Sequence, residues 1–276
     1  METVMTRRTL LTSNLSLSLL VPLQLAALLI TNGSGHAQDH EISITVSEGT
    51  NMAAAVSPDG QRIVIDLQGT LWVRETGATE ARAITDTYYD ARQPHWSPNG
   101  RRIVFQSFRD GNWHIWSIKP DGSDPKQHTF GPYDEREPRY SPQGDQIAFS
   151  SDRAGNYDVW TLRLEDGKTF QVTETTSHEY TPAWSSDGAM LAYASSREGG
   201  SIWTRPQDGG SEKLIATTPG AIAPSWDPDG QRIAFPAVTQ GQTALYVTEL
   251  RAEPNTLPKM LSEPGDDVFP FHPHWI

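Results

Sequence analysis

Two short segments hold residue types that could bind a metal ion. His272 and His274 would share one face of a strand, and imidazole nitrogens are common zinc ligands. Residues 152–158 read Asp-Arg-Ala-Gly-Asn-Tyr-Asp and offer the oxygen ligands that calcium prefers. However, the two histidines fall within a sequence repeat, and the acidic segment lacks the distant Glu of a calcium loop. We therefore interpret them as blade and hairpin residues, and we expect neither a metal site nor a cofactor.

Patterns for other kinds of catalysis are missing from the sequence. There is no Gly-x-Ser-x-Gly nucleophile elbow, no P-loop and no dinucleotide-binding fingerprint. The chain has no Cys, which excludes disulfides, thiolate chemistry and a lipid anchor on an N-terminal Cys. We predict no catalytic residue within this chain. Three further histidines lack a partner motif and are expected to be structural or surface residues: His114, His128 and His178.

A third group of residues is suited to binding. Segments 86–93, 130–137 and 174–181 combine Tyr, Arg and His with carboxylates. Tyr and Arg often anchor protein interfaces, although solvated loop residues are the simpler interpretation. The candidate interaction residues are Tyr88, Tyr89, Asp90, Arg92, Tyr133, Asp134, Arg136, His178 and Tyr180. With a net charge of −12, we expect the partner to be another protein or a downstream catalytic domain, and not a nucleic acid.

The elements that position these residues follow from a repeat. One short phrase occurs five times and ends in a glycine at positions 60, 100, 144, 188 and 230. It reads Ser57-Pro58-Asp59-Gly60 in the first copy, with single replacements later. Proline presets the second position of a turn and glycine accepts a left-handed conformation, so the phrase predicts a tight turn between antiparallel strands. A period near 40 residues indicates one supersecondary unit copied along the chain.

Each unit predicts four strands. The first ends in Pro-x-aromatic, as in Pro94-His95-Trp96. The second alternates apolar residues such as Ile103 and Phe105 with small ones, which is typical of a strand covered on both faces. The third carries Trp or Tyr, as at Trp116, expected to pack between units, and a short fourth strand follows a second turn. Four antiparallel strands in about 40 residues predict a β-propeller blade, and so an all-β fold.

We predict five complete blades followed by the first strand of a sixth at 271–276, in a propeller that spans 52–276 and ends early. Within residues 38–51, the alternating segment 41–46 is expected to form a lead-in strand that could close the ring. The sequence leaves open whether the ring closes, stays open or pairs with a second copy through its edge strands.

Residues 1–37 are predicted to be an export signal. Arg7 and Arg8 form a basic start, 15–30 is mostly apolar, and Gly35-His36-Ala37 supplies the small residues of a cleavage site. A transmembrane anchor is the alternative, but Ser, Asn, Pro and Gln interrupt the apolar stretch. The match to a twin-arginine signal is partial, so the export route stays open. We expect a periplasmic or secreted bacterial protein without a stable membrane anchor once the signal is removed.

The repeat resembles a known family. The Pro-x-Trp-Ser-Pro-x-Gly phrase, with Ile147–Arg153 and Asn156–Trp160, is similar to the WD-like propeller repeat of TolB proteins over about residues 52–276. TolB proteins carry an α/β domain before the propeller, for which the residues between Gln38 and the first blade leave no room. Segments 48–60 and 65–72 are more similar to propellers fused to periplasmic amidohydrolases, whose metal-dependent domain lies downstream.

The resemblance implies three functions. The first is a noncatalytic exported propeller that binds another protein or an attached domain through its loops. The second is the N-terminal propeller of a metal-dependent amidohydrolase. The third is the propeller of a prolyl-oligopeptidase-like peptidase, which would need a downstream Ser-His-Asp domain. In each case, any active site would lie outside this chain.

Overall fold

The computed structural model describes residues 3–8, 41–46, 52–251 and 257–262, and the chain divides into two compact units, Met1–Glu48 and Gly49–Ile276. In the first unit, β1 (Thr3–Arg8) pairs antiparallel with β2 (Glu41–Val46). The alternating segment 41–46 is thus a strand. Its role in closing a ring, and the export signal at 1–37, stay predictions.

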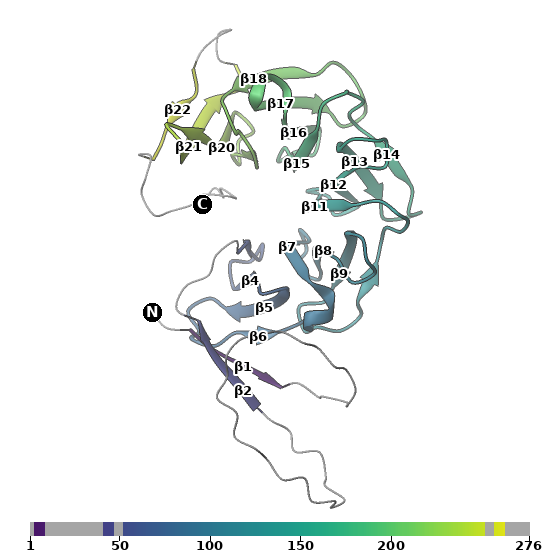
Figure 1. Cartoon of the computed structure of the whole chain (residues 1–276), viewed down its shortest axis with the longest axis vertical. Coiled ribbons are helices and arrows are strands. Elements are labelled where there is room, and N and C mark those ends of the chain that lie inside the picture. The colour runs from purple at the N-terminus through teal and green to yellow at the C-terminus, as the bar shows by residue number, and fades with distance from the viewer. Residues whose placement is uncertain (1–2, 9–40, 47–51, 252–256, 263–276) are drawn as a thin grey trace, which may run out of the picture. The chain divides into compact units, whose positions relative to one another are not determined.

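The second unit consists of five four-stranded antiparallel sheets, each built from consecutive strands (Figure 1). This confirms the predicted all-β propeller of five complete blades. Blade 1 contains β3 (Ala54–Val56), β4 (Arg62–Leu67), β5 (Thr70–Glu75) and β6 (Arg82–Ala83). Blade 2 contains β7 (Ala91–Trp96), β8 (Ile103–Ser107), β9 (His114–Ile118) and β10 (Lys126–Gln127). Blade 3 contains β11 (Glu135–Tyr140), β12 (Gln146–Ser151), β13 (Asp158–Arg163) and β14 (Thr169–Gln171).

The last two blades follow the same order. Blade 4 contains β15 (Glu179–Trp184), β16 (Met190–Ser195), β17 (Ser201–Pro206) and β18 (Lys213–Thr217). Blade 5 contains β19 (Ser225–Trp226), β20 (Arg232–Thr239), β21 (Gln242–Glu249) and β22 (Lys259–Met260). The helical segments of the described chain are two 3₁₀ turns, η1 (Thr87–Tyr89) and η2 (Arg197–Gly199). The predicted first strand of a sixth blade, with His272 and His274, lies outside the described residues.

The repeated phrase forms the turn between the first two strands of each blade. In blade 2 the Gly100 N–H donates to the Ser97 carbonyl at 2.9 Å, and Gly100 has φ +66°. The Ser97 hydroxyl accepts the Arg102 N–H at 2.9 Å. In blade 5 an Oδ1 of Asp227 accepts the corresponding N–H of Arg232 at 3.0 Å. An oxygen acceptor is therefore what the first position of the turn requires, which explains why Asp can replace Ser there.

The hydrophobic core lies between neighbouring blades. Ile103 and Phe105 of β8 are fully buried and pack toward blade 1, whereas Val104 on the other side of the strand packs toward blade 3. Similar apolar clusters join blade 3 to blade 4 and blade 4 to blade 5. The second strands are covered on both faces, as their sequence predicts.

The Trp residues that end the first strands also bond blades to one another. The indole N–H of Trp96 donates to the Ala55 carbonyl at 3.0 Å, and that of Trp184 to the Arg139 carbonyl at 3.1 Å. Trp226 donates likewise to Ala183 at 3.1 Å. Each indole therefore joins its blade to the preceding one by packing and by a hydrogen bond, which confirms the aromatic packing expected between blades.

A repeated kink precedes the proline of these strands. Gln93, Glu137, Thr181 and Ala223 have φ between +44° and +59°, although none is glycine. Three of the four kinks fall at a register shift between first and second strands. Each kink turns a backbone N–H toward a side chain of the preceding blade, and the donor–acceptor pairs are Gln93–Asp66 (2.6 Å), Glu137–Gln106 (2.8 Å), Thr181–Glu137 (2.6 Å) and Ala223–Thr181 (2.9 Å). These bonds offset the cost of the left-handed backbone.

Candidate functional site

Two kinds of loop lie at the same end of the blades. One connects the fourth strand of a blade to the first strand of the next, and the other connects the second and third strands. We call this surface the loop face, and we call the opposite end, formed by the Ser-Pro-x-Gly turns, the turn face. All of the predicted interaction residues lie on loops or strand ends at the loop face.

A ladder of cationic and aromatic side chains crosses blades 2 to 4 at the loop face. Its members, in order, are Arg92, Trp113, Arg136, Tyr157 and His178. The Trp113 ring lies between two guanidinium groups, with Arg92 Cζ at 5.3 Å and Arg136 Cζ at 5.4 Å from its centre. Arg136 Cζ also lies 5.8 Å from the Tyr157 ring, which is 6.1 Å from the His178 ring. We call this set the ladder.

Hydrogen bonds hold the ladder in place. Oδ1 of Asp134 accepts the backbone N–H of Trp113 at 3.1 Å, and Oδ2 accepts a hydrogen bond from the Arg136 guanidinium at 2.9 Å. Burial alone would raise the pKa of Asp134, but these two bonds bring it below its usual range. One repeat later, His178 takes the place of Asp134 as acceptor, because its Nδ1 accepts the backbone N–H of Tyr157 at 3.3 Å. That contact places the proton of neutral His178 on Nε2.

The predicted tyrosines differ in their exposure. Tyr88 is 83% exposed and Tyr133 is 37% exposed, whereas Tyr89 is buried at 7%. Tyr89 packs edge-on against Phe105 and Trp116 in the core between blades 1 and 2. The 3₁₀ turn η1 places Tyr88 in solvent and Tyr89 in the core. Tyr89 is therefore a packing residue and no part of the loop-face surface.

Asp90 and Tyr180 are the remaining predicted residues. Arg92 forms an ion pair with Asp90 at 3.0 Å, and Tyr180 is partly buried at the start of β15. Burial raises the pKa of Tyr180, and the nearby Glu137 and Glu179 carboxylates raise it further. The structure brings Arg92, Arg136 and His178 together through two residues absent from the prediction, Trp113 and Tyr157. Their signal was available, since each follows an Asn and the two are one 44-residue period apart.

Two exposed phenylalanines were also absent from the prediction. Phe108 is 43% exposed and its ring lies 5.4 Å from that of Trp113. Phe130 is 66% exposed in the loop that leads to blade 3. Both have polar neighbours in the sequence, so they fall within segments that were expected to be polar hairpins and loops.

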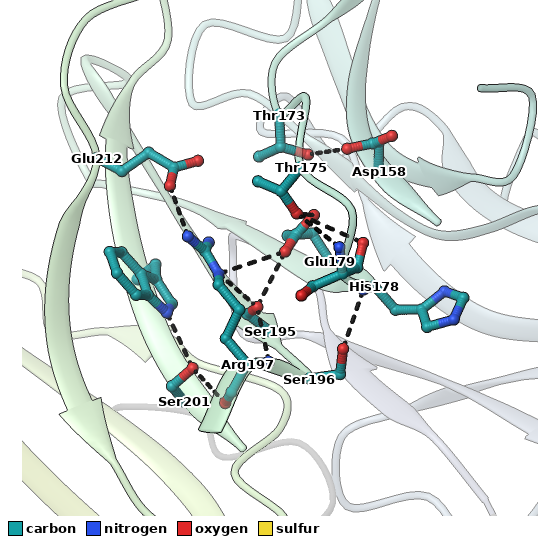
Figure 2. Close-up of polar contacts among 12 residues, drawn as sticks. Asp158, Thr173, Thr175, His178, Glu179, Ser195, Ser196, Arg197, Ser201 and Glu212 are labelled. Atoms are coloured by element: carbon teal, nitrogen blue, oxygen red, sulfur yellow. Dashed lines mark hydrogen bonds and ion pairs between the residues drawn. The ribbon is translucent and has the colours of Figure 1, made fainter. Parts of the chain in front are cut away.

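A partly buried ionic network joins side chains of blade 4 (Figure 2). Figure 2 shows Arg197 between Glu212 and Glu179. The Arg197 guanidinium lies 2.8 Å from the Glu212 carboxylate and 3.6 Å from that of Glu179, which is fully buried. Its Cζ lies 3.8 Å from the centre of the Trp203 ring. Burial raises the pKa of Glu179, although hydrogen bonds from Thr175 and Ser195 oppose the change. The network ties η2 to blade 4.

The equivalent network of blade 3 is joined by His114 of β9 in blade 2. Nδ1 of this buried histidine lies 3.1 Å from Oε2 of buried Glu135, which also contacts Arg153. In the segment considered for calcium, Asp152 accepts the Asp134 N–H at 2.9 Å and Asp158 accepts the Thr173 hydroxyl at 2.9 Å. These oxygens serve as internal acceptors. No group of three or more metal-ligating side chains occurs among the residues that the structure describes.

Comparison with known proteins agrees with this architecture. Residues 131–220, which cover blades 3 and 4, match the model of the TolB β-propeller domain. The chain carries a TolB-like β-propeller.

Solved structures of TolB share the fold of this TolB-like propeller. TolB from Acinetobacter baumannii is 20% identical with a TM-score of 0.63, over 72% of this chain and 51% of that one. A putative TolB from Agrobacterium tumefaciens is 18% identical with a TM-score of 0.67, over 76% and 81%. The chain is also 26% identical over 138 residues to dipeptidyl-peptidase 5 of Porphyromonas endodontalis, covering 45% of this chain and 20% of that protein. It thus spans a fifth of that peptidase and about half of the first TolB.

The loop face presents exposed aromatic rings on loops that ion pairs and hydrogen bonds hold rigid. In the described part of the chain, no helix is long and apolar enough to cross a membrane.

Proposed function

We propose that this chain is a noncatalytic binding module that docks another protein on its loop face. One observation carries the proposal: the exposed aromatic side chains of Tyr88, Phe108 and Tyr133 lie on the same loop face as the ladder, and Phe108 contacts its Trp113. Tyrosine, tryptophan and arginine supply most of the binding energy at protein interfaces. Loops that are already rigid lose little conformational entropy when a partner binds.

Site-specific photo-crosslinking tests this proposal. A photoreactive phenylalanine analogue replaces Tyr88 or Tyr133 on the loop face, and Gln61 or Asp229 on the turn face, all of which are exposed. In the native host, we expect one discrete crosslinked protein from the two loop-face positions and none from the two turn-face controls. Crosslinks confined to the turn face, or equal at both ends, would reject the loop face as the binding surface.

A second candidate is the propeller of a larger hydrolase. It is favoured by the match to dipeptidyl-peptidase 5, of which this chain covers a fifth. In that arrangement the loop face would contact a catalytic domain of the same polypeptide. The amidohydrolase version, which rests on sequence resemblance, requires the same arrangement. An immunoblot of the native host separates the two candidates: a band near or somewhat below 30.6 kDa supports the separate binding module, and a band of about twice that mass supports the hydrolase.

We also propose that the protein is exported, on the basis of Arg7, Arg8 and the apolar stretch 15–30. Cell fractionation with N-terminal sequencing is expected to find a shortened chain outside the cytoplasm. An intact N-terminus in the cytoplasmic fraction would contradict export.

A further inference from the structure

A groove of about 380 Å³ lies between blades 3 and 4. Blade 3 contributes Gln146, Phe170 and Gln171 to its lining, and blade 4 contributes Arg205 and Gln207. The groove lies toward the turn face, since Gln146 begins β12 directly after the Ser-Pro-x-Gly turn of blade 3. Its volume falls within the range of small-molecule sites, about 300–1,000 Å³. It is therefore a candidate ligand site that is separate from the ladder.

Arg205 places a charged group where other blades have an apolar one. It occupies the position that Ile118 and Leu162 hold in blades 2 and 3, since all three lie opposite equivalent residues of the second strand. Ile118 and Leu162 are buried in the core, whereas the Arg205 side chain is 24% exposed. Its Nε is buried without a hydrogen-bond partner in the described chain, and its Nη1 lies 4.0 Å from Oε1 of Glu212. An oxygen of a ligand would satisfy this guanidinium.

A short side chain at position 146 leaves space for the groove. Blades 1, 2 and 5 carry Arg two residues after the turn glycine, whereas blade 3 carries Gln146. In blade 2 this arginine, Arg102, donates to the Ser117 hydroxyl at 2.9 Å and to the Asp124 carboxylate at 2.8 Å. The Arg102 side chain thus occupies the place that, in blade 3, is part of the groove.

Three glutamines supply donors and acceptors together. Nε2 of Gln146 donates to Oε1 of Gln207 at 3.3 Å, which joins the two blades at the groove. This bond leaves the Gln146 oxygen as an acceptor and the two amide hydrogens of Gln207 as donors. Gln171 donates to the Asp158 carboxylate at 3.2 Å and keeps its own oxygen as an acceptor. The groove therefore suits a ligand whose groups both donate and accept.

Phe170 adds an exposed aromatic ring. It lies on β14 and is 45% exposed, whereas blade 2 has Lys126 at the equivalent position. Cζ of Arg163 lies 5.0 Å from the centre of the Phe170 ring, and this guanidinium is paired with Asp166 at 3.0 Å. Because the Asp166 carboxylate balances the charge of Arg163, the ring offers apolar contact beside a neutral pair.

We propose that the groove between blades 3 and 4 binds a pyranose ring. The Arg205 guanidinium and the Gln207 amide donate to sugar oxygens, and the Gln146 oxygen accepts from a hydroxyl. Phe170 packs on the C–H face of the ring. A hydroxyl both donates and accepts, whereas an inorganic anion offers acceptors alone and would leave the glutamine oxygens unpaired. Such a ring occurs as a free sugar and as a unit of a glycan chain.

NMR titration of the full chain tests the proposal with four probes, the methyl pyranosides of glucose, galactose, mannose and N-acetylglucosamine. We expect at least one of them to bind saturably. Inorganic phosphate and trialanine serve as comparison probes for an anion site and a peptide site. No saturable binding of any pyranoside would overturn the proposal, as would tighter binding of phosphate or of the peptide than of every pyranoside.

Two variants carry residues that other blades already have, so both should fold with melting temperatures close to that of the wild type. Arg205→Leu introduces the residue that blade 3 has at this position, and Gln146→Arg introduces the arginine of blades 1, 2 and 5 into the groove. Each should weaken the bound pyranoside by at least tenfold, because the first removes the charged donor and the second fills the space. Unchanged affinity in either variant would contradict the proposed site.

A pair of apolar truncations tests the aromatic contact. Phe170→Ala should weaken the pyranoside by at least tenfold. Leu214→Ala removes a side chain of β18 that is 40% exposed and lies outside the groove, so it should leave the affinity unchanged. Equal affinities of the two variants would exclude stacking on Phe170.

The disaccharide of the sugar that binds best separates the two sources of the ring. Binding at least tenfold tighter than that of the methyl pyranoside identifies a glycan chain, and a smaller gain identifies a single sugar. Crosslinking at the loop face does not depend on this groove, so either proposal can fail without the other.

Discussion

At the scale of single residues, chemically identical tryptophans have different partners. The indole N–H of Trp96 bonds to the carbonyl of Ala55 in the preceding blade, whereas that of Trp116 is buried without a hydrogen-bond partner in the described structure. Trp96→Phe should therefore cost about 1 kcal/mol more unfolding free energy than Trp116→Phe, because it also removes a hydrogen bond between two blades. Urea denaturation of the two variants measures the difference. Equal losses would mean that the indole bond contributes nothing beyond packing.

One histidine makes stability depend on pH. Burial, with the nearby charges of Arg102 and Lys126, lowers the pKa of His128 from 6.5 to about 4. Between these values the unfolded chain binds more protons at His128 than the folded chain, so stability falls as the pH drops. At pH 4.5 this residue should cost about 2–3 kcal/mol relative to pH 7.5.

Denaturation of the wild type and of His128→Gln at both pH values isolates this effect from that of the buried carboxylates. Glutamine can keep a hydrogen bond to the Ser117 hydroxyl, which His128 contacts at 2.7 Å. We expect the variant to lose less stability on acidification than the wild type. Parallel losses would show that His128 titrates normally in the folded protein.

At the scale of elements, the kink before each proline combines strain with a bond between blades. Ala223 has φ +44°, which favours glycine, whereas Ala183 of β15 lies outside the left-handed region and pairs with Ala192 of β16. Ala223→Gly should stabilise the fold by about 0.5–1 kcal/mol, because relief of strain exceeds the added entropy of the unfolded chain. Ala183→Gly should destabilise it by a similar amount. Thermal denaturation of both variants tests the pair, and destabilisation by Ala223→Gly would contradict the assigned strain.

The elements differ in how far sequence could predict them. The turns and the second strands follow from local chemistry, because Ser-Pro-x-Gly and alternating apolar residues such as Ile103 and Phe105 specify them directly. The kinks could not be predicted: Gln93 and Thr181 precede proline, a position that favours extended backbone, and only acceptors in the preceding blade stabilise the left-handed form. The burial of Tyr89 depends in the same way on a tertiary contact, its packing against Trp116.

At the scale of the whole molecule, the five blades share one strand pattern, and the side chains that differ among them lie mainly at the ends of the blades. Arg92 and Arg136 occupy equivalent positions in blades 2 and 3, whereas Tyr180 occupies that position in blade 4. The ladder therefore has no further arginine after Arg136 and ends at His178. The repeated residues determine the fold, and we expect binding to depend on the few loop positions at which one blade differs from the next.

The loop face as docking surface is tested most directly by affinities for the crosslinked partner. The double variant Tyr88→Ala/Tyr133→Ala is compared with Gln61→Ala/Asp229→Ala, which alters two exposed residues of the turn face. Calorimetry should show a loss of about 2 kcal/mol or more, roughly 30-fold or more in Kd, for the loop-face pair and less than 0.5 kcal/mol, about twofold, for the turn-face pair. A larger loss from the turn-face pair would contradict the account.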